Sequence, residues 1–139
     1  MIIDQLKQLE KESIARKIPI LGSSKGSWLY EKILKIKPQK ILELGTANGY
    51  SGVILGSQGA ELITVEQDQE IAQEAKQNFK KFKINAEVTI GDGIEIIKDL
   101  VESESNTFDL IFIDFSKSNY IKVLESCIKC DKLSFFFSF

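Results

Sequence analysis

The stretch that decides the fold of this chain reads Ile41-Leu42-Glu43-Leu44-Gly45-Thr46-Ala47-Asn48-Gly49-Tyr50-Ser51. A short apolar run carries one acidic residue, and two glycines and the polar start of a helix follow it. This order is typical of a buried strand that turns sharply, so that backbone N–H groups and a helix N-terminus face a ligand. We call the turn at residues 45–49 the glycine loop.

Strand-like and helix-like segments alternate from this stretch onward. Strands are predicted at residues 41–44, 62–65, 86–90 and 108–114. Helices are predicted at residues 51–55, after a cap at Asp68, around residues 94–101 and from Ser118. Strict alternation of this kind predicts an α/β fold, in which a parallel sheet is covered by helices on both faces.

The two ends of the chain extend this pattern. Upstream, helices are predicted at residues 3–15 and 26–36, with a loop at residues 18–25 between them. Downstream, the phenylalanine-rich residues 133–139 have the pattern of a further strand, which we expect to form a bare sheet edge and a route to a homodimer. A length of 139 residues with 43% hydrophobic side chains fits a single domain, residues 1–139.

The composition excludes several classes of function. The chain has no histidine, which excludes Ser-His-Asp and Cys-His mechanisms and His-ligated metals. A net charge of −2 offers no broad basic surface for nucleic acid. Neither a leader nor a membrane-spanning apolar run is found, so we expect a cytoplasmic protein. The C-x-x-C of Cys127 and Cys130 falls late in a predicted helix, and we interpret it as ordinary helix residues with Cys127 in the core.

The spacing within the glycine loop excludes a dinucleotide. A G-x-G-x-x-G loop would place glycines where Ala47 and Tyr50 stand, and the Gly-Lys-Ser/Thr triplet of a P-loop does not occur. An acid two residues before Gly45, followed by Gly49 and Ser51, instead resembles the first motif of S-adenosylmethionine-dependent methyltransferases.

This resemblance implies roles for the residues of the motif. Glu43 is expected to favour the ammonium group of the cofactor, and Ser51 to bind its carboxylate. Gly45 and Gly49 are expected to let the backbone approach the cofactor closely.

Two further acids lie at the carboxyl ends of the following strands, where sheets of this type bind ligands. Glu66 ends the second strand and is expected to bind the ribose hydroxyls. Asp92 ends the third strand, with Gly93 beside it, and is expected to accept a hydrogen bond from the adenine amine. Each acid alone is equally well explained as a solvated loop residue or a helix cap. The cofactor is predicted because three acids, Glu43, Glu66 and Asp92, follow one another at the ends of successive strands.

Three longer segments, residues 21–26, 43–51 and 108–120, make the resemblance more specific. Together they resemble the metal-dependent O-methyltransferases of the catechol and caffeoyl-CoA type, which implies a Rossmann-like class I methyltransferase fold. In that family, residues 21–26 correspond to a loop through which cofactor and substrate enter. Leu21 is therefore a candidate cofactor contact.

The last of these segments implies the catalytic residues. Asp114 corresponds to a ligand of a divalent cation, usually magnesium, and to a residue beside the cofactor. Such a cation holds the oxygens of a vicinal diol and makes them more acidic. Lys117 corresponds to the base that removes the acceptor's proton. The ionised oxygen then attacks the sulfonium methyl group in line.

The chain also departs from this family. Ser116 stands where the family commonly has a second acid, and residues 133–139 lack the Asp-Asn pair that completes the cation site. The last two strands of the fold and the loops that cover the substrate are missing as well. We therefore expect a C-terminally truncated domain with nearly complete cofactor contacts and an incomplete catalytic site.

Three functions remain open on the sequence alone. The first is an O-methyltransferase acting on a small, hydroxylated, catechol-like acceptor. The second is a catalytically impaired, truncated remnant that still binds the cofactor. The third is a relative of the tRNA hydroxyuridine methyltransferases, which the lack of a basic face disfavours.

Overall fold

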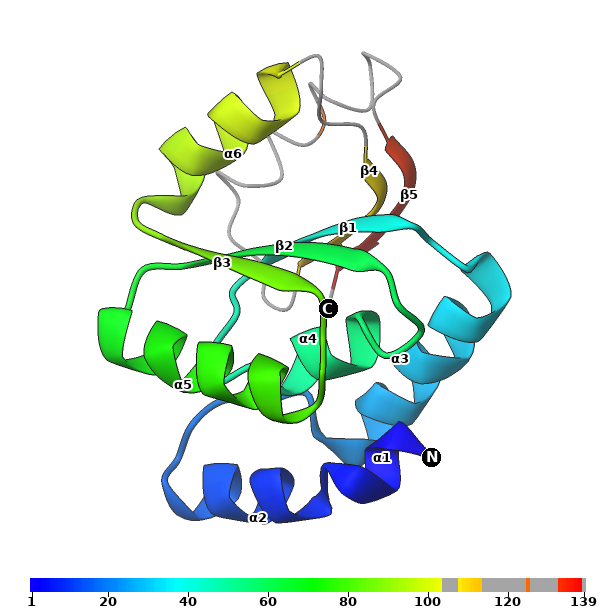
Figure 1. Cartoon of the computed structure of the whole chain (residues 1–139), viewed down its shortest axis with the longest axis vertical. Helices are drawn as coiled ribbons and strands as arrows, with labels where there is room; N and C mark the ends of the chain where they lie inside the picture. The colour runs from blue at the N-terminus through cyan, green and yellow to red at the C-terminus, as the bar shows by residue number, and fades with distance from the viewer. Residues whose placement is uncertain (104–107, 114–124, 126–132, 139) are drawn as a thin grey trace.

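The structure is a computed structural model that describes residues 1–103, 108–113, 125 and 133–138. Its centre is a five-stranded parallel sheet in the order β3-β2-β1-β4-β5 (Figure 1). The strands are β1 (Lys40–Leu44), β2 (Glu61–Glu66), β3 (Ala86–Ile90), β4 (Phe108–Ile113) and β5 (Leu133–Ser138). The described helices are α1 (Ile2–Gln5), α2 (Lys7–Ala15), α3 (Gly22–Ile36), α4 (Tyr50–Leu55), α5 (Gln69–Lys81) and α6 (Gly93–Glu102).

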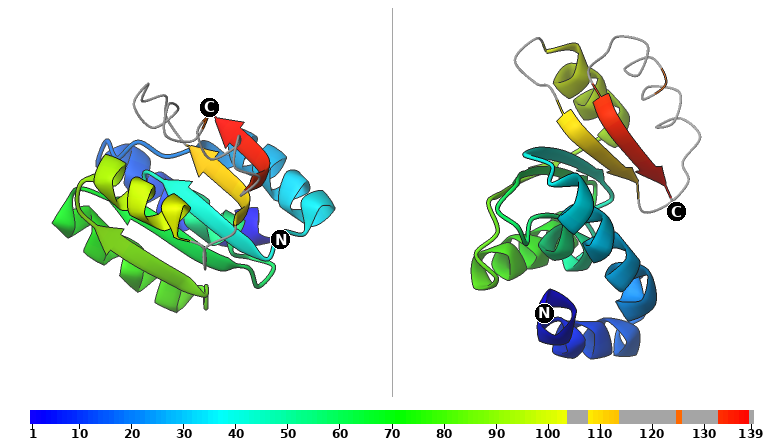
Figure 2. Two further views of the ribbon diagram at one scale, coloured as in Figure 1. Left: turned by 90° about the horizontal axis from the view of Figure 1, so that it is seen from above. Right: turned by 90° about the vertical axis from the view of Figure 1, so that its right-hand side faces the viewer.

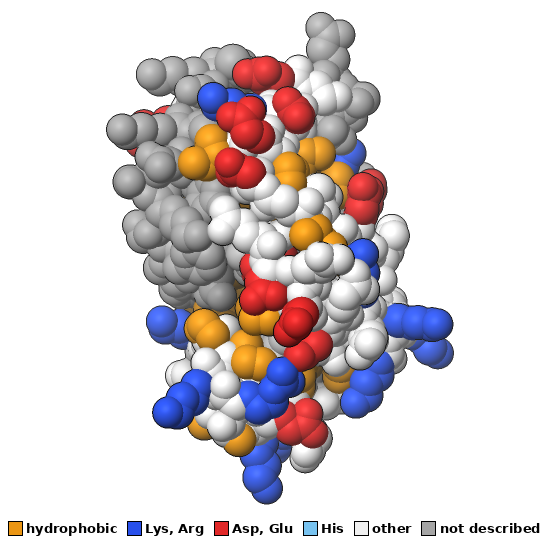
Figure 3. Space-filling view, turned by 90° about the vertical axis from the view of Figure 1, so that its left-hand side faces the viewer, with side chains coloured by type: hydrophobic (Ala, Val, Ile, Leu, Met, Phe, Trp, Pro, Cys, Tyr) orange, Lys and Arg blue, Asp and Glu red, His pale blue; other side chains and the backbone are white. Residues whose placement is uncertain are grey.

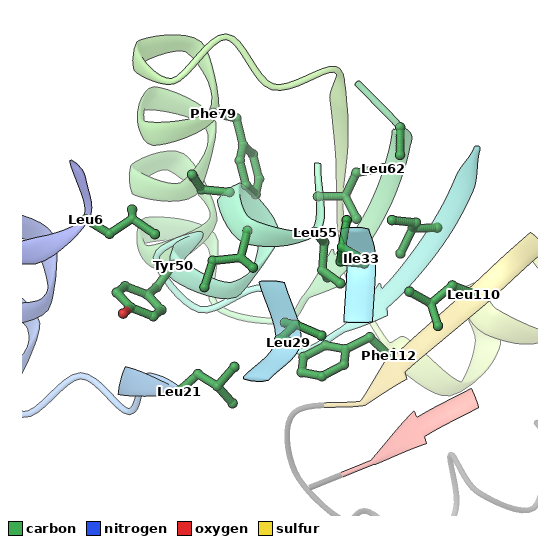
Figure 4. Close-up of a cluster of buried hydrophobic side chains, with 14 of the residues drawn as sticks. Leu6, Leu21, Leu29, Ile33, Tyr50, Leu55, Leu62, Phe79, Leu110 and Phe112 are labelled. Carbon is green, nitrogen blue, oxygen red and sulfur yellow. The ribbon is translucent and has the colours of Figure 1, made fainter. Parts of the chain in front are cut away.

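Helices cover the sheet on both faces, because the side chains of each buried strand alternate between two apolar cores. On one face, Ile41 and Leu62 pack with residues of α1, α3, α4 and α5, a cluster that Figure 4 shows. On the other face, Leu42 and Ile63 pack against Ile97 of α6. The right-hand view of Figure 2 shows α6 on the opposite side of the sheet from α1 and α2. The predicted α/β fold is confirmed.

The local signals for α5 and β5 are also confirmed. The side chain of Asp68 accepts hydrogen bonds from the backbone N–H groups of Glu70 (3.0 Å) and Ile71 (3.2 Å), as an N-cap does. Strand β5 lies at one end of the described sheet and pairs in parallel with β4. Apart from residue 125, which is helical, the predicted helix from Ser118, with Cys127 and Cys130, lies outside the described residues.

The upstream helices correct the sequence prediction in two places. The predicted helix at 3–15 is divided at Leu6 into α1 and α2. The loop predicted at residues 18–25 is too long, because α3 already begins at Gly22. A carboxylate oxygen of Glu10, on α2, accepts the backbone N–H of Ser23 at 3.1 Å, so α2 supplies the polar partner at the start of α3. Sequence spacing does not reveal such a tertiary contact.

A single carboxylate fixes the start of β1 against β4. Oδ2 of Asp109 accepts the backbone N–H groups of Gln39 at 2.7 Å and of Lys40 at 3.0 Å. Gln39 directly precedes β1 and Lys40 is its first residue, and β1 is the central strand that leads into the glycine loop. Asp109 therefore sets the position of β1 relative to its neighbour.

We expect Asp109→Ala to lower the free energy of unfolding by roughly 1–3 kcal/mol, because two backbone donors lose a charged acceptor. Urea denaturation of the two proteins measures this difference. Asp109→Asn keeps one oxygen able to accept both bonds, so its loss should be clearly smaller. Equal losses for Ala and Asn would show that the two hydrogen bonds do not contribute.

Candidate functional site

The glycine loop connects β1 to α4 through three residues in the left-handed backbone region. Gly45, Ala47 and Gly49 have φ values of 90°, 46° and 94°. A side chain at Gly49 would be strained by this φ, and its Cβ would lie 3.2 Å from the ring of Phe79. Ala47 has no such freedom, and its conformation costs on the order of 1 kcal/mol. The surrounding structure must hold this loop in place.

Backbone hydrogen bonds tie the loop to the end of β2. The N–H groups of Gly45 and Thr46 both donate to the carbonyl oxygen of Val65, at 3.1 and 3.3 Å. The N–H of Ala47 donates to Oε1 of Glu66 at 2.9 Å. The other carboxylate oxygen of Glu66 accepts the N–H of Asp68 at 3.0 Å. Glu66 thus links the glycine loop to the start of α5.

Glu43 and Ser51, predicted as separate contacts of the cofactor, are bonded to each other. The side chain of Glu43 is fully buried in the sheet face that α4 covers, and Ser51 on α4 donates its hydroxyl to Oε2 of Glu43. Thr64 on β2 donates to Oε1 at 2.9 Å. Because the Thr64 hydrogen is used in that bond, Thr46 donates in turn to Thr64. Their predicted contacts with the cofactor stay predictions.

Sequence reasoning missed Thr46 and Thr64. The available signal was the polar Thr64 within the otherwise apolar Leu62–Val65 run, since buried hydroxyls require a partner. The register places Thr64 directly beside Glu43, which shows what that partner is.

Asp92 and Gly93 lie next to Glu66, at the same edge of the sheet. The N–H of Gly91 donates to the carbonyl oxygen of Glu66 at 3.0 Å, which joins the carboxyl ends of β2 and β3. Asp92 is exposed and caps α6 by accepting the N–H of Ile94 at 3.0 Å, and Gly93 is buried as the first residue of that helix. The glycine loop, Glu66 and Asp92 therefore lie along one edge.

Of the remaining predicted site residues, the structure describes only Leu21. The side chain of Leu21 is buried in the core cluster with Leu29 and Phe112, just before α3 (Figure 4). Asp114 and Lys117 lie outside the described residues. Within the described residues, no three His, Cys, Asp or Glu side chains gather as a metal site.

Tyr50 is the first residue of α4 and its side chain is only 1% exposed. Burial, assisted by the nearby charge of Glu10, raises the pKa of Tyr50 to about 12. Within the part of the chain that the structure describes, its hydroxyl has no hydrogen-bond partner. Tyr50 is therefore neutral at ordinary pH and is a poor general base.

The comparisons with known proteins agree with this geometry. A family model for O-methyltransferases matches residues 2–136. The chain belongs to this O-methyltransferase family. The catechol O-methyltransferase of Niastella koreensis is 31% identical over 117 residues, covering 81% of this chain and 53% of that protein. Catechol O-methyltransferase B of Danio rerio is 35% identical over 118 residues, covering 77% of this chain and 44% of that protein.

Solved structures of the family share the fold. The O-methyltransferase of Bacillus cereus, solved in complex with SAH, matches with a TM-score of 0.75 and 25% identity over 91% of this chain and 60% of that one. The predicted resemblance and the class I methyltransferase fold are confirmed. The chain spans about half the length of the curated relatives quoted above. No helix among the described residues is long and apolar enough to cross a membrane.

The buried phenol of Tyr50 predicts a component near pH 12 in an ultraviolet titration of the three tyrosines. Because burial favours the neutral phenol, the stability it contributes is present below about pH 10 and is lost as the pH rises toward 12. Tyr50→Phe should remove this component from the titration, and Tyr30→Phe should leave it in place. A component near pH 12 that survives in Tyr50→Phe would contradict the assignment.

Proposed function

We propose that this chain, as one domain of residues 1–139, binds S-adenosylmethionine and transfers its methyl group to a hydroxyl of a small, catechol-like acceptor. The observation that carries the proposal is the common position of the glycine loop, Glu66 and Asp92 at one edge of a parallel sheet. Family membership and the catechol O-methyltransferase relatives support the same reaction. A small-molecule acceptor follows from those relatives. A cytoplasmic location and a homodimer stay predictions.

The hydrogen bonds of Glu66 support its proposed contact with the ribose. Each of its carboxylate oxygens already accepts one backbone N–H, from Ala47 and from Asp68. A carboxylate oxygen has two acceptor sites, so one on each oxygen remains for the two ribose hydroxyls. The bonds to the backbone hold the carboxylate in a fixed orientation, which lowers the entropy cost of binding.

The other cofactor contacts are assigned by position. Exposed Asp92, after the end of β3, is suited to accept a hydrogen bond from the adenine amine, and Gly93 follows it as the first residue of α6. The methionine part is assigned to the glycine loop, where Gly45 and Gly49 keep the backbone free of side chains. Glu43, Ser51 and Leu21 complete this set in the proposal.

The chemical step is assigned to Lys117, whose neutral amine takes the proton of the acceptor hydroxyl. The oxygen then attacks the methyl carbon while the bond from that carbon to sulfur breaks, and S-adenosylhomocysteine leaves. Asp114 is the residue of this chain proposed to hold a divalent cation, which would polarise the acceptor oxygens. Because Mg²⁺ keeps most of its waters when only one or two carboxylates bind it, Asp114 alone would hold it weakly.

The charge pattern disfavours the tRNA reading. On the face shown in Figure 3, acidic side chains run down the middle and the basic ones gather toward the lower end. A phosphate backbone binds best to a continuous basic stripe, which this face does not have. The truncated remnant is distinguished by experiment, because it would bind the cofactor without transferring a methyl group.

Calorimetric titration with S-adenosylhomocysteine tests the cofactor site. Glu66→Gln should weaken binding by about tenfold or more, since a charged acceptor becomes a neutral amide with one oxygen. Glu70→Gln removes a neighbouring exposed carboxylate and is the matched control, which should bind like the wild type. Equal affinity for wild type and Glu66→Gln would contradict the ribose contact.

Methyl transfer from labelled S-adenosylmethionine to a panel of catechols, with and without magnesium, tests the reaction. Lys117→Met should lower kcat by roughly a hundredfold or more, because a general base is lost, while cofactor affinity stays unchanged. Lys98→Met, which replaces an exposed lysine of α6, is the control. Binding of the cofactor by the wild type without transfer to any acceptor would favour the remnant.

A further inference from the structure

Helix α2 contacts the glycine loop through a buried hydrogen bond. Nδ2 of Asn48 donates to Oγ of Ser13 at 2.7 Å, and Ser13 donates its own hydroxyl to the carbonyl oxygen of Leu9 at 2.6 Å. Both side chains are 1% exposed. Because the Ser13 hydrogen is used within α2, its oxygen can only accept from Asn48. The direction of the Asn48 side chain is therefore fixed.

Helix α5 holds the backbone of the same residue. Nδ2 of Asn78 donates to the carbonyl oxygen of Asn48 at 2.7 Å. Asn48 thus has its side chain held by α2 and its peptide group held by α5. It stands between Ala47 and Gly49, two of the three loop residues with positive φ. These bonds act where the loop backbone is most strained.

The Asn48 side chain is poorly suited to a purely stabilising role. Its Oδ1 is buried and has no hydrogen-bond partner among the described residues, which costs on the order of 1–3 kcal/mol. A polar pocket of about 320 Å³ lies at this junction, with Ser13, Asn48 and Asn78 in its wall. An apolar residue would avoid the cost of the unpaired oxygen. The asparagine provides a directional bond that an apolar residue cannot provide.

A second contact joins α2 to α5 without touching the loop. The guanidinium of Arg16 donates to both carboxylate oxygens of Glu74, at 3.0 and 2.6 Å, on the exposed rim of the same pocket. The docking of α2 on α5 therefore has a component that is separate from the loop. This separation allows the two effects to be measured independently.

We propose that Ser13, Asn48 and Asn78 are positioning residues that hold the glycine loop in its binding-competent conformation. The inference rests on the proposed function, since it takes the cofactor as the ligand of this loop. Without these bonds the loop populates other conformations. The apparent affinity for the cofactor is then the intrinsic affinity multiplied by the fraction of molecules whose loop is binding-competent. Helix α2 thereby contributes to cofactor affinity through Ser13, without contacting the cofactor.

The test compares variants in two measurements, calorimetric titration with S-adenosylhomocysteine and amide hydrogen exchange of residues 45–49 in the free protein. Ser13→Ala and Asn78→Leu should each weaken binding about three- to tenfold, the effect of losing one net hydrogen bond. Both should also speed exchange in the loop. Ser13→Cys still fills the position, with a slightly larger atom, but sulfur is a weak acceptor, so this variant should behave like Ser13→Ala.

Arg16→Gln is the matched control, because it removes the charge and the two-bond contact between Arg16 and Glu74 and leaves the loop bonds intact. It should leave both affinity and loop exchange at the wild-type values. Equal effects of Arg16→Gln and Ser13→Ala, or unchanged loop exchange in Ser13→Ala, would overturn the proposal. If Ser13→Ala does not fold, Ser13→Cys and Asn78→Leu decide the question. If the wild type binds no S-adenosylhomocysteine, the proposed function fails, and the exchange measurement still tests the positioning role.

Discussion

The buried carboxylate of Glu43 is the constraint on which the arrangement around the glycine loop depends. It lies on the central strand β1, beside Thr64 of β2 and Phe112 of β4 in the register of the sheet. A carboxylate in such a position is costly unless it is hydrogen-bonded, and here hydroxyls of β2 and α4 donate to it. The same group therefore joins two strands and the helix that follows the loop. The start of α4 and the end of β2 cannot move independently of β1.

The conformation of the loop follows from that anchor. The hydroxyl of Thr46, in the loop, donates to the hydroxyl of Thr64. The backbone N–H of the next residue, Ala47, donates to the carboxylate of Glu66. Asn48 is then held from α2 and α5. Consecutive residues of the loop are thus held by different elements of the fold. A strained backbone is kept in one conformation by many weak contacts, and this is the preorganisation that a ligand-binding loop requires.

Much of this structure could be predicted from the sequence, where the signals are local. Apolar runs and helical spacing located the strands, and Asp68 marked the start of α5. The acid at each strand end was visible, because a parallel sheet brings the carboxyl ends of its strands to one edge. Contacts between distant segments could not be predicted. Three such contacts are the bond from Ser23 to Glu10, the bond from Thr64 to Glu43 and the bond from Asn48 to Ser13. Each depends on which helices or strands the folded chain brings together. Asp114 and Lys117 stay predictions, since they lie outside the described residues.

The strand order has a consequence that does not depend on any side chain. Strands β1, β2 and β3 follow one another in one direction across the sheet, and β4 then pairs with the other edge of β1. Right-handed crossovers therefore put α4 and α5 on one face and α6 on the other, as the two core clusters show. The strand order therefore reverses between β1 and β4, and open α/β sheets bind their ligands beyond the carboxyl ends of the strands at such a point. The glycine loop leaves β1 at this topological switch point, so the path of the backbone alone places the loop where sheets of this type bind ligands, whatever its side chains contribute.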